Sequence, residues 1–596
     1  MHSRKKGVSN LKLKKSVSAV VAMAAGTALL VTGCGTSTNN TSNSSNSTSS
    51  TSQLTPQKGG TITVALPPQT DLNWYFPLVN SSYDSLYNFQ MIDMLYKPLI
   101  WIGSNYKINY SSSVADKIQY NNKGTVYHVY LNPKWKWSNG QPVTSSDVLF
   151  SWNVIKAISA PNAPAPWPYV NAGVGDIPNG VQSVVANGPY EFTVTLKQPA
   201  NQQWFIYNGL SQLVPLPAKV LNKYPNNMTQ EIKYLGQNGT NPNFDTVVDG
   251  PFKLQNAVSN QSWTLVPNTA YSGHKSLVDK LIFTYEGSNA AEFAALKTGT
   301  VNVGYIDQSQ LGAKSALTSM GDKITPSYSL SFFDEMPNMN SGSKSASIFK
   351  HLYVREALMM GEDQQSMNQY IYKGFAESQY GPLPPQPDTA FTSPELLKPL
   401  YPFNIEAGKK LLEEHGWHEV NGIMTKNGQQ MKFLMIYSGG TTSTDDQVEL
   451  LKEDWAKEGI DVTLKSMPFS TLESVISNPK DANQWDLAAG QGIIYGGSYP
   501  TGGEIFGTGG GLNSGGYSNP EMDTLIKATH QPYPTQQQSI QALFNYENYV
   551  AQQLPVIFTD NPASLTVTAA NVHDVNTYSN PVTGYPQMNY WWVSSK

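Results

Sequence analysis

Apolar and polar residues alternate over several short stretches of the chain, and this pattern predicts β-strands. Residues 59–66 alternate before Pro67 and Pro68, and residues 126–131 alternate in the same way. A helix is expected after the second strand, because Thr144 is a suitable N-cap and Asp147, three residues later, completes a capping box. The first part of the chain therefore mixes strands with at least one helix.

A strand, a helix and a second strand are predicted in succession over residues 431–464. Residues 431–435 alternate, apolar residues recur on one helical face through residues 448–455, and residues 460–464 alternate again. Asn404 predicts the start of another helix, which should end at Gly416 because glycine is favoured just past a helix terminus. Two strands joined by a helix should be parallel, which predicts a mixed α/β fold.

The first 57 residues differ in character from the rest. Six basic residues precede an apolar stretch at 17–31 that is too short for a comfortable membrane span, and this predicts a signal peptide over residues 1–33. The ending Val-Thr-Gly-Cys resembles the bacterial lipobox, which implies a lipid anchor on Cys34. An ordinary secretory signal with an incidental cysteine is the alternative. Residues 34–57 are mostly Ser, Thr and Asn, which predicts a disordered linker.

Composition narrows the classes of function. The chain has 39 basic and 43 acidic residues, and loss of the signal peptide would remove only basic ones. A net-negative body argues against nucleic acid as a partner. The chain has one cysteine, so its stability must come from packing and not from internal disulfides. We expect a monomer, anchored through Cys34 at the extracellular face of the cytoplasmic membrane.

Short motifs in a consistent order resemble those of the dipeptide-, oligopeptide- and nickel-binding lipoproteins of ABC importers, which form the extracellular solute-binding protein family 5. The first motif is the turn and capped helix at residues 135–148. One position departs from the pattern, because Asn302 stands where the family usually has Asp. The other motifs lie at residues 249–254, 267–271, 296–303, 353–363, 406–423, 516–521 and 554–555.

The resemblance implies an α/β, two-lobed fold of the periplasmic-binding-protein type, class II-like, with an extra inserted subdomain. Lobe I would comprise residues 58–98, 220–287 and 565–596. The inserted subdomain would comprise residues 99–219, and lobe II residues 288–564. Repeated crossings between the lobes would create a hinge.

The resemblance also places ligand-binding candidates in a glycine-rich stretch. Peptide-binding relatives hold the ligand's ammonium group with an aspartate in a Trp-x-x-Asp-Tyr segment. The corresponding stretch here places Tyr495 at the aromatic position, Ser498 at the acidic position and Tyr499 after it. A hydroxyl gives a weaker hydrogen bond to an ammonium group than a carboxylate does. Either the ligand lacks a free ammonium group, or Glu504 replaces the missing acid.

Further candidates are less specific. Asn338 and Asn340 lie where a family amide would meet the ligand, but they also suit a plain turn. Trp74 follows a stretch that resembles one near the family's cleft, and a structural role is the alternative. Arg355, the only arginine after residue 33, sits in a scaffold motif. We expect it to form a structural ion pair with Asp363 or another acid, with direct contact to an acidic ligand as the alternative.

The implied function is a receptor that captures a small solute and delivers it to an ABC permease and its ATPase. A peptide is the leading ligand, because main-chain groups can hold an extended backbone while pockets accept varied side chains. An oligosaccharide or another non-peptide solute is the main alternative, since sugars stack on aromatic faces and the chain has 13 Trp and 33 Tyr. An enzyme or an adhesive surface protein is a remote alternative, and no catalytic residue, metal or cofactor is predicted.

Overall fold

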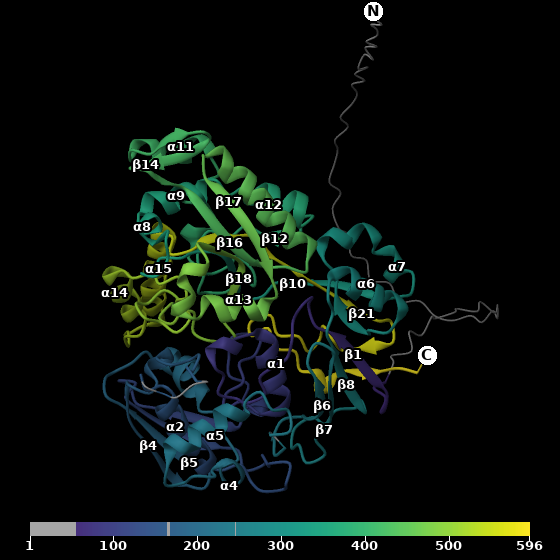
Figure 1. Ribbon diagram of the computed structural model, residues 1–596. Helices are drawn as coiled ribbons and strands as arrows, with labels where there is room; N and C mark the ends of the chain where they lie inside the picture. The colour runs from purple at the N-terminus through teal and green to yellow at the C-terminus, as the bar shows by residue number, and fades with distance from the viewer. Residues whose placement is uncertain (1–54, 162, 164–166, 245, 596) are drawn as a thin grey trace, which may run out of the picture. The chain divides into compact units, whose positions relative to one another are not determined.

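The computed structural model describes residues 55–161, 163, 167–244 and 246–595 (Figure 1). The predicted signal peptide, the lipidation site Cys34 and nearly all of the predicted linker lie outside the described residues. No helix in the described part of the chain has the length and apolar character needed to cross a bilayer.

A mixed seven-stranded sheet, called the first sheet below, contains the predicted opening strand. Its strand β1 pairs in parallel with β8 and with β9. The predicted boundary of lobe I at residue 288 is wrong for this sheet, because β9 and β10 also belong to it. In order, the strands are β10 (Lys323–Ser327), β21 (Ser564–Thr568), β9 (Val303–Tyr305), β1 (Thr61–Ala65), β8 (Lys280–Thr284), β7 (Ser262–Pro267) and β6 (Phe252–Val258).

A five-stranded sheet, called the second sheet, contains the predicted strand, helix and strand. Strands β16 and β17 are parallel, and α12 (Thr442–Lys457) connects them, which confirms that prediction. The buried residues Leu451 and Trp455 lie on one face of α12. In order, the strands are β17 (Asp461–Met467), β16 (Lys432–Ser438), β18 (Leu487–Ile494), β11 (Ser331–Pro337) and β19 (Ile557–Thr559).

A four-stranded antiparallel sheet lies entirely within the range expected for the inserted subdomain. The helix α2 (Ser145–Ile158) begins after Thr144 as predicted, and the Asp147 carboxylate accepts the Thr144 N–H at 2.8 Å. In order, the strands are β2 (Ala115–Tyr120), β3 (Val126–Leu131), β5 (Glu191–Leu196) and β4 (Val181–Gly188).

Two short segments connect the first sheet to the second. Residues 328–330 run from β10 to β11, and residues 560–563 run from β19 to β21. The side-chain oxygen of Asn561 accepts a hydrogen bond from the Ser331 hydroxyl at 3.3 Å, and its amide donates to the Ser329 carbonyl at 3.4 Å. The two connections are therefore bound to each other, and together we call them the crossing segments.

The remaining elements surround these sheets. Asn404 caps α11 as predicted, accepting the Ala407 N–H at 3.0 Å, and Gly416 follows the helix with a φ of +82°. The other helices are α1 (Leu86–Leu95), α3 (Gln202–Trp204), α4 (Ala218–Leu221), α5 (Met228–Asn238), α6 (Asn289–Thr298), α7 (Ser315–Thr318), α8 (Ala346–Phe349), α9 (Leu352–Met360), α10 (Gln364–Ser366), α11 (Ile405–Glu414), α13 (Phe469–Ile476), α14 (Pro520–Thr529) and α15 (Gln536–Gln553). The smaller strands are β12 (Ala376–Glu377), β13 (His418–Val420), β14 (Ile423–Lys426), β15 (Gln429–Gln430), β20 (Asn561–Pro562), β22 (Val572–His573) and β23 (Trp592–Val593).

Candidate functional site

Two adjacent cavities open beside the second sheet, the larger one between it and the first sheet and the smaller one between it, α1 and the range expected for the inserted subdomain. One has a volume of about 730 Å³ and the other about 490 Å³. Together we call them the cleft, because they have lining residues in common. The shared residues come from α1, β11 and β18, and they are Leu86, Tyr87, Phe333, Gly490 and Ile494.

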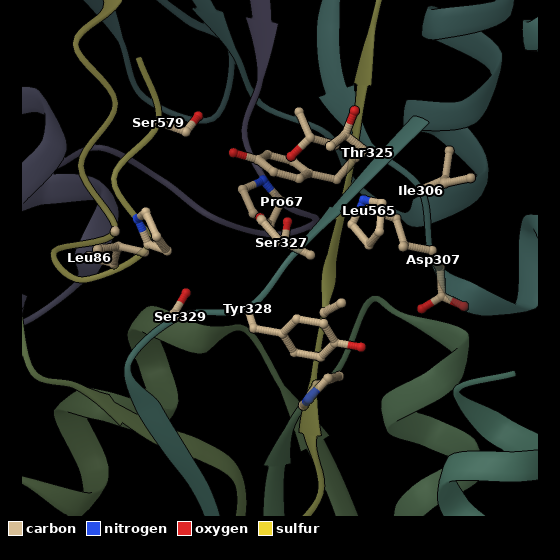
Figure 2. A pocket seen from close by; sticks show the side chains of 18 of the residues that line it. Pro67, Leu86, Ile306, Asp307, Thr325, Ser327, Tyr328, Ser329, Leu565 and Ser579 are labelled. Carbon is tan, nitrogen blue, oxygen red and sulfur yellow. The ribbon is translucent and has the colours of Figure 1, made fainter. Parts of the chain in front are cut away.

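The crossing segments line the larger cavity. Figure 2 shows Tyr328 and Ser329 on one crossing segment, next to Thr325 and Ser327 of β10. Residues 560–563 of the other crossing segment line the same cavity. The floor of this cavity is therefore the place where the chain passes from one sheet to the other, so that a change in the backbone there would move one sheet relative to the other.

The predicted glycine-rich stretch lines the smaller cavity. It follows β18, and Gly496 and Gly497 adopt φ values of +59° and +87°, which favour glycine. The Tyr495 hydroxyl donates to the Pro382 carbonyl at 2.9 Å, and the Ser498 carbonyl accepts from the Tyr106 hydroxyl. The main-chain N–H and C=O groups of both glycines have no hydrogen-bond partner among the described residues. They are free to bind a ligand.

The predicted candidates from this stretch divide into two groups. Tyr495, Ser498 and Glu504 line the smaller cavity, so the structure brings these three together. Tyr499 does not line it, because its ring is buried at 1 % exposure and its N–H donates to the Asn208 side chain at 2.7 Å. The expectation that Tyr499 contacts the ligand is therefore corrected to a packing role.

Trp74, Asn338 and Asn340 do not line either cavity. Trp74 is fully buried, and its indole N–H donates to the Phe76 carbonyl at 2.7 Å. Asn338 is also fully buried, because its amide donates to the Ala482 and Trp485 carbonyls at 2.9 and 3.0 Å.

The Asn340 amide is engaged as well, since it donates to the Ser514 carbonyl at 2.7 Å. The structural alternatives for Trp74, Asn338 and Asn340 therefore replace the ligand-binding interpretation.

Arg355 is buried, but its partners are carbonyls and not carboxylates. Its Nε and Nη2 atoms donate to the Gln553 carbonyl at 3.1 and 2.8 Å, and its Nη1 atom donates to the Phe349 carbonyl at 2.5 Å. Asp363 instead accepts the Ser366 N–H at 2.9 Å and caps α10. The predicted ion pair between Arg355 and Asp363 is corrected, because each side chain satisfies main-chain groups.

Carboxyl groups in the smaller cavity form the main feature that the sequence did not reveal. Burial raises the pKa of Asp334 to about 8 and that of Glu504 to about 7. Burial raises the pKa of Glu473 to about 8, with further contributions from the nearby Asp84 and Asp334. Each of these acids comes from a different element, so no local motif marks them. The five carboxyl groups are Asp84, Asp93, Asp334, Glu473 and Glu504.

The arrangement does not fit a metal centre. In the described part of the chain, no three His, Cys, Asp or Glu side chains converge closely enough to hold an ion. Instead the carboxyl groups of the cleft are spread between aromatic rings. Such a chamber is suited to enclosing a polar organic ligand.

Two sheets, the segments that cross between them and an enclosed cleft define an extracellular solute-binding protein of the two-lobed type. Residues 109–513 match Bacterial extracellular solute-binding proteins, family 5 Middle, and the chain belongs to this family.

Two known proteins illustrate the similarity. The oligopeptide-binding protein AppA of Bacillus subtilis is 24% identical over 548 residues, which cover 90% of this chain and 92% of that protein. The structure of AppA in complex with a nonapeptide has a TM-score of 0.75 at 22% identity, covering 91% of this chain and all of AppA. The Escherichia coli murein tripeptide binding protein MppA has a TM-score of 0.73 at 16% identity, covering 91% of this chain and 100% of MppA. These structures share the fold of this chain.

Proposed function

We propose that this chain is a lipid-anchored receptor on the extracellular face of the membrane, which encloses a peptide in the cleft and delivers it to an ABC permease. The observation that carries the proposal is the run of free main-chain groups at Gly496 and Gly497 in the smaller cavity. The N–H and C=O groups of a peptide backbone can pair with such groups whatever the side chains of the peptide are. The likeness to peptide-binding relatives supports the same ligand class.

Closure of the cleft supplies the mechanism. A ligand that touches both sheets favours the closed state by the difference between its affinities for the closed and open states. The crossing segments are the only parts of the described chain that run directly from a strand of the first sheet to a strand of the second. Bending at these segments would therefore open and close the cleft without disturbing either sheet.

An oligosaccharide is the second candidate, and the aromatic lining of the smaller cavity favours it. Trp101, Tyr169, Tyr207 and Tyr585 all line this cavity. Aromatic faces and hydroxyl groups can hold sugars as well as peptides. The free main-chain groups make peptide the stronger choice, because a peptide backbone carries both the donors and the acceptors that pair with them.

Ligand recovery and titration test the proposal. The purified protein is denatured, and the released small molecules are identified by mass spectrometry. A tripeptide pool and an oligosaccharide pool are then titrated separately while Trp fluorescence is recorded. Peptides in the recovered fraction and a saturable response to peptides are expected. A saturable response to sugars alone would overturn the peptide choice, and a chemically altered ligand would point to an enzyme.

The lipid anchor has its own test. Replacement of Cys34 by Ala in the full chain should release the protein from the membrane fraction, because the acyl chains would be lost. The unsubstituted chain serves as the control and should label with a radioactive fatty acid. Unchanged fractionation of the C34A variant would refute the anchor while leaving the ligand proposal intact.

A further inference from the structure

Negative charge in the cleft is not balanced by positive charge. Within the described residues, neither cavity is lined by a Lys, Arg or His side chain. Of the three acids that line the larger cavity, two have protein partners. Glu292 accepts the Tyr305 N–H at 2.6 Å, and Asp307 accepts the Ser309 N–H at 2.9 Å. The third, Asp560, has no hydrogen-bond partner among the described residues, but it is alone, whereas the smaller cavity brings five carboxyl groups together.

One carboxyl group of the smaller cavity, that of Asp334, has an oxygen without a hydrogen-bond partner. Asp334 lies on β11, its side chain is 2 % exposed, and it lines the smaller cavity. Its Oδ1 atom is buried and has no hydrogen-bond partner among the described residues. A buried carboxyl group without a partner costs free energy, and such groups normally have one. A hydrogen-bond donor held in the cavity would supply the missing partner.

Asp334 does not stand alone. Glu473 of α13 and Asp84, which directly follows the short helix Ser81–Tyr83, line the same cavity and act on each other electrostatically. We call Asp84, Asp334 and Glu473 the acidic trio. Its members come from three elements far apart in the sequence, and no hydrogen bond joins their side chains to other described side chains. The fold has placed three carboxyl groups on the wall of one cavity.

Asp93 and Glu504, the other two acids of the smaller cavity, give weaker evidence for a bound cation. Asp93 lies near Lys97, whose positive charge opposes the rise in the pKa of Asp93 that burial causes. Lys97 also acts on Asp249 and does not itself line the cavity. Glu504 lies in the loop beyond Ser498 and is a separate position. The acidic trio therefore carries the argument.

We infer that the ligand is a cationic peptide and that a Lys or Arg side chain of the peptide occupies the space among Asp84, Asp334 and Glu473. The inference rests on the proposed peptide-binding function. An ammonium or guanidinium group brings several N–H donors and a positive charge, and it would satisfy the orphan oxygen of Asp334. A metal ion is the less suitable occupant, because no group of described acids is arranged to hold one.

We assign the cation to a side chain and not to the ammonium terminus of the peptide. Three carboxyl groups around one space can hold one cation while accepting hydrogen bonds from each of its N–H groups, as a guanidinium with five donors requires. The main-chain groups of Gly496 and Gly497 would hold the peptide backbone beside it. This places the recognition of charge in the acidic trio and the recognition of backbone in the glycine segment.

Titration calorimetry with matched peptides tests the inference. The peptides are Ala-Ala-Xaa-Ala-Ala with Xaa as Lys, Arg, Gln or Glu, each also prepared with an acetylated N-terminus. The Lys and Arg peptides should bind at least about tenfold more tightly than the Gln peptide, and the Glu peptide should bind most weakly. The same preference should persist after acetylation.

Each other outcome has a distinct meaning. Equal affinities for the Lys, Gln and Glu peptides would overturn the cationic ligand while leaving peptide binding in place. A preference that acetylation abolishes would also overturn the inference, because the terminal amine would then be the cation recognised. Failure of every peptide to bind would instead refute the proposed function.

Substitutions locate the effect. Asp334→Asn and Glu473→Gln should each lower the affinity for the Arg peptide by about tenfold and leave the affinity for the Gln peptide unchanged. Unchanged binding of the Gln peptide shows that each variant is folded. Glu413→Gln, an exposed position on α11 outside the cleft, is the matched control. Loss of the Arg preference in the control, or its retention in both cleft variants, would overturn the assignment.

Discussion

The carboxylate of Asp307 accepts hydrogen bonds from both the hydroxyl and the main-chain N–H of Ser443. Asp307 follows strand β9 of the first sheet, whereas Ser443 lies in the first turn of α12, which packs on the second sheet. This contact therefore joins the two sides of the larger cavity, which both residues line. It is a direct bond that opening of the cleft would have to break.

We expect Ser443→Ala to weaken ligand binding about tenfold, since a hydrogen bond to a charged group contributes about 1.5–3 kcal/mol. The closed state would lose this contact while the open state would lose nothing. Ser309→Ala is the control, because the Ser309 hydroxyl donates to the same carboxylate from the same side of the cavity. Affinity by calorimetry and the radius of gyration by X-ray scattering are the measurements. Equal effects of the two substitutions would show that the contact does not report closure.

The replacement of Arg355 tests whether its side chain stabilises the fold through main-chain carbonyls. Arg355→Lys should lower the free energy of unfolding by about 2–3 kcal/mol, because lysine cannot donate to the Gln553 and Phe349 carbonyls at once. Asp363→Asn should change it by less than about 0.5 kcal/mol, because asparagine also caps helices well. Denaturant unfolding measures both values. A large cost at Asp363 would restore the ion-pair interpretation.

The features that the sequence predicted correctly are set by neighbouring residues. The start of α2 after Thr144, the start of α11 after Asn404 and the parallel pair β16 and β17 all follow from local pattern. Tyr495 and Ser498, which were placed by resemblance to a family segment, line the smaller cavity, and their contact with a ligand stays a prediction. These predictions needed no knowledge of which distant segments meet.

The features that the sequence could not predict depend on contacts between distant segments. Arg355 donates to the carbonyl of Gln553, which is 198 positions away. Every residue has a main-chain carbonyl, so no residue type in the sequence identifies this partner. Asn338 suited either a ligand contact or a plain turn. In the structure its buried amide donates to the carbonyls of Ala482 and Trp485. The acidic trio is the clearest case, since its members are ordinary acids until folding removes water from around them.

Asp334 should reduce the stability of the ligand-free protein. Its pKa is raised from 3.8 to about 8 by burial, so the folded state holds its proton more tightly than the unfolded state does. Its contribution to the free energy of unfolding therefore falls as the pH rises from about 4 to about 8 and then stays low. Asparagine does not ionise, so Asp334→Asn should be more stable than the parent by up to about 6 kcal/mol above pH 8.

This stability gain should be small near pH 4, where the carboxyl group is protonated in the folded state and about half protonated in the unfolded state. Thermal and urea unfolding at pH 4 and pH 8.5 check the prediction. Glu413→Gln serves again as the control, because an exposed acid should change little at either pH. A gain for Asp334→Asn that is equal at the two pH values would show that ionisation is not its cause. A gain at pH 8.5 combined with weaker Arg-peptide binding would show that the site costs stability for function.

Binding of a cationic peptide should release protons and should strengthen as the pH rises. In the empty cleft the raised pKa values keep much of the acidic trio protonated near neutral pH, and a bound guanidinium would favour the ionised forms. The Arg peptide should therefore bind about tenfold more tightly at pH 8.5 than at pH 5.5, while the Gln peptide should change little. The facing groups that titrate or carry charge are Asp84 with a pKa of about 6, Asp93 and Glu504 at about 7, Asp334 and Glu473 at about 8, and the nearby Lys97 at about 8.

Calorimetry in buffers of different ionisation enthalpy measures the proton count directly. The Arg peptide should release protons at pH 7, and the Gln peptide should release none. Asp334→Asn should reduce the number released, because one titrating group is gone. The arginine side chain stays charged throughout this range, so the change must come from the protein. Proton uptake in place of release, or equal release with both peptides, would show that the acidic trio does not bind the cation.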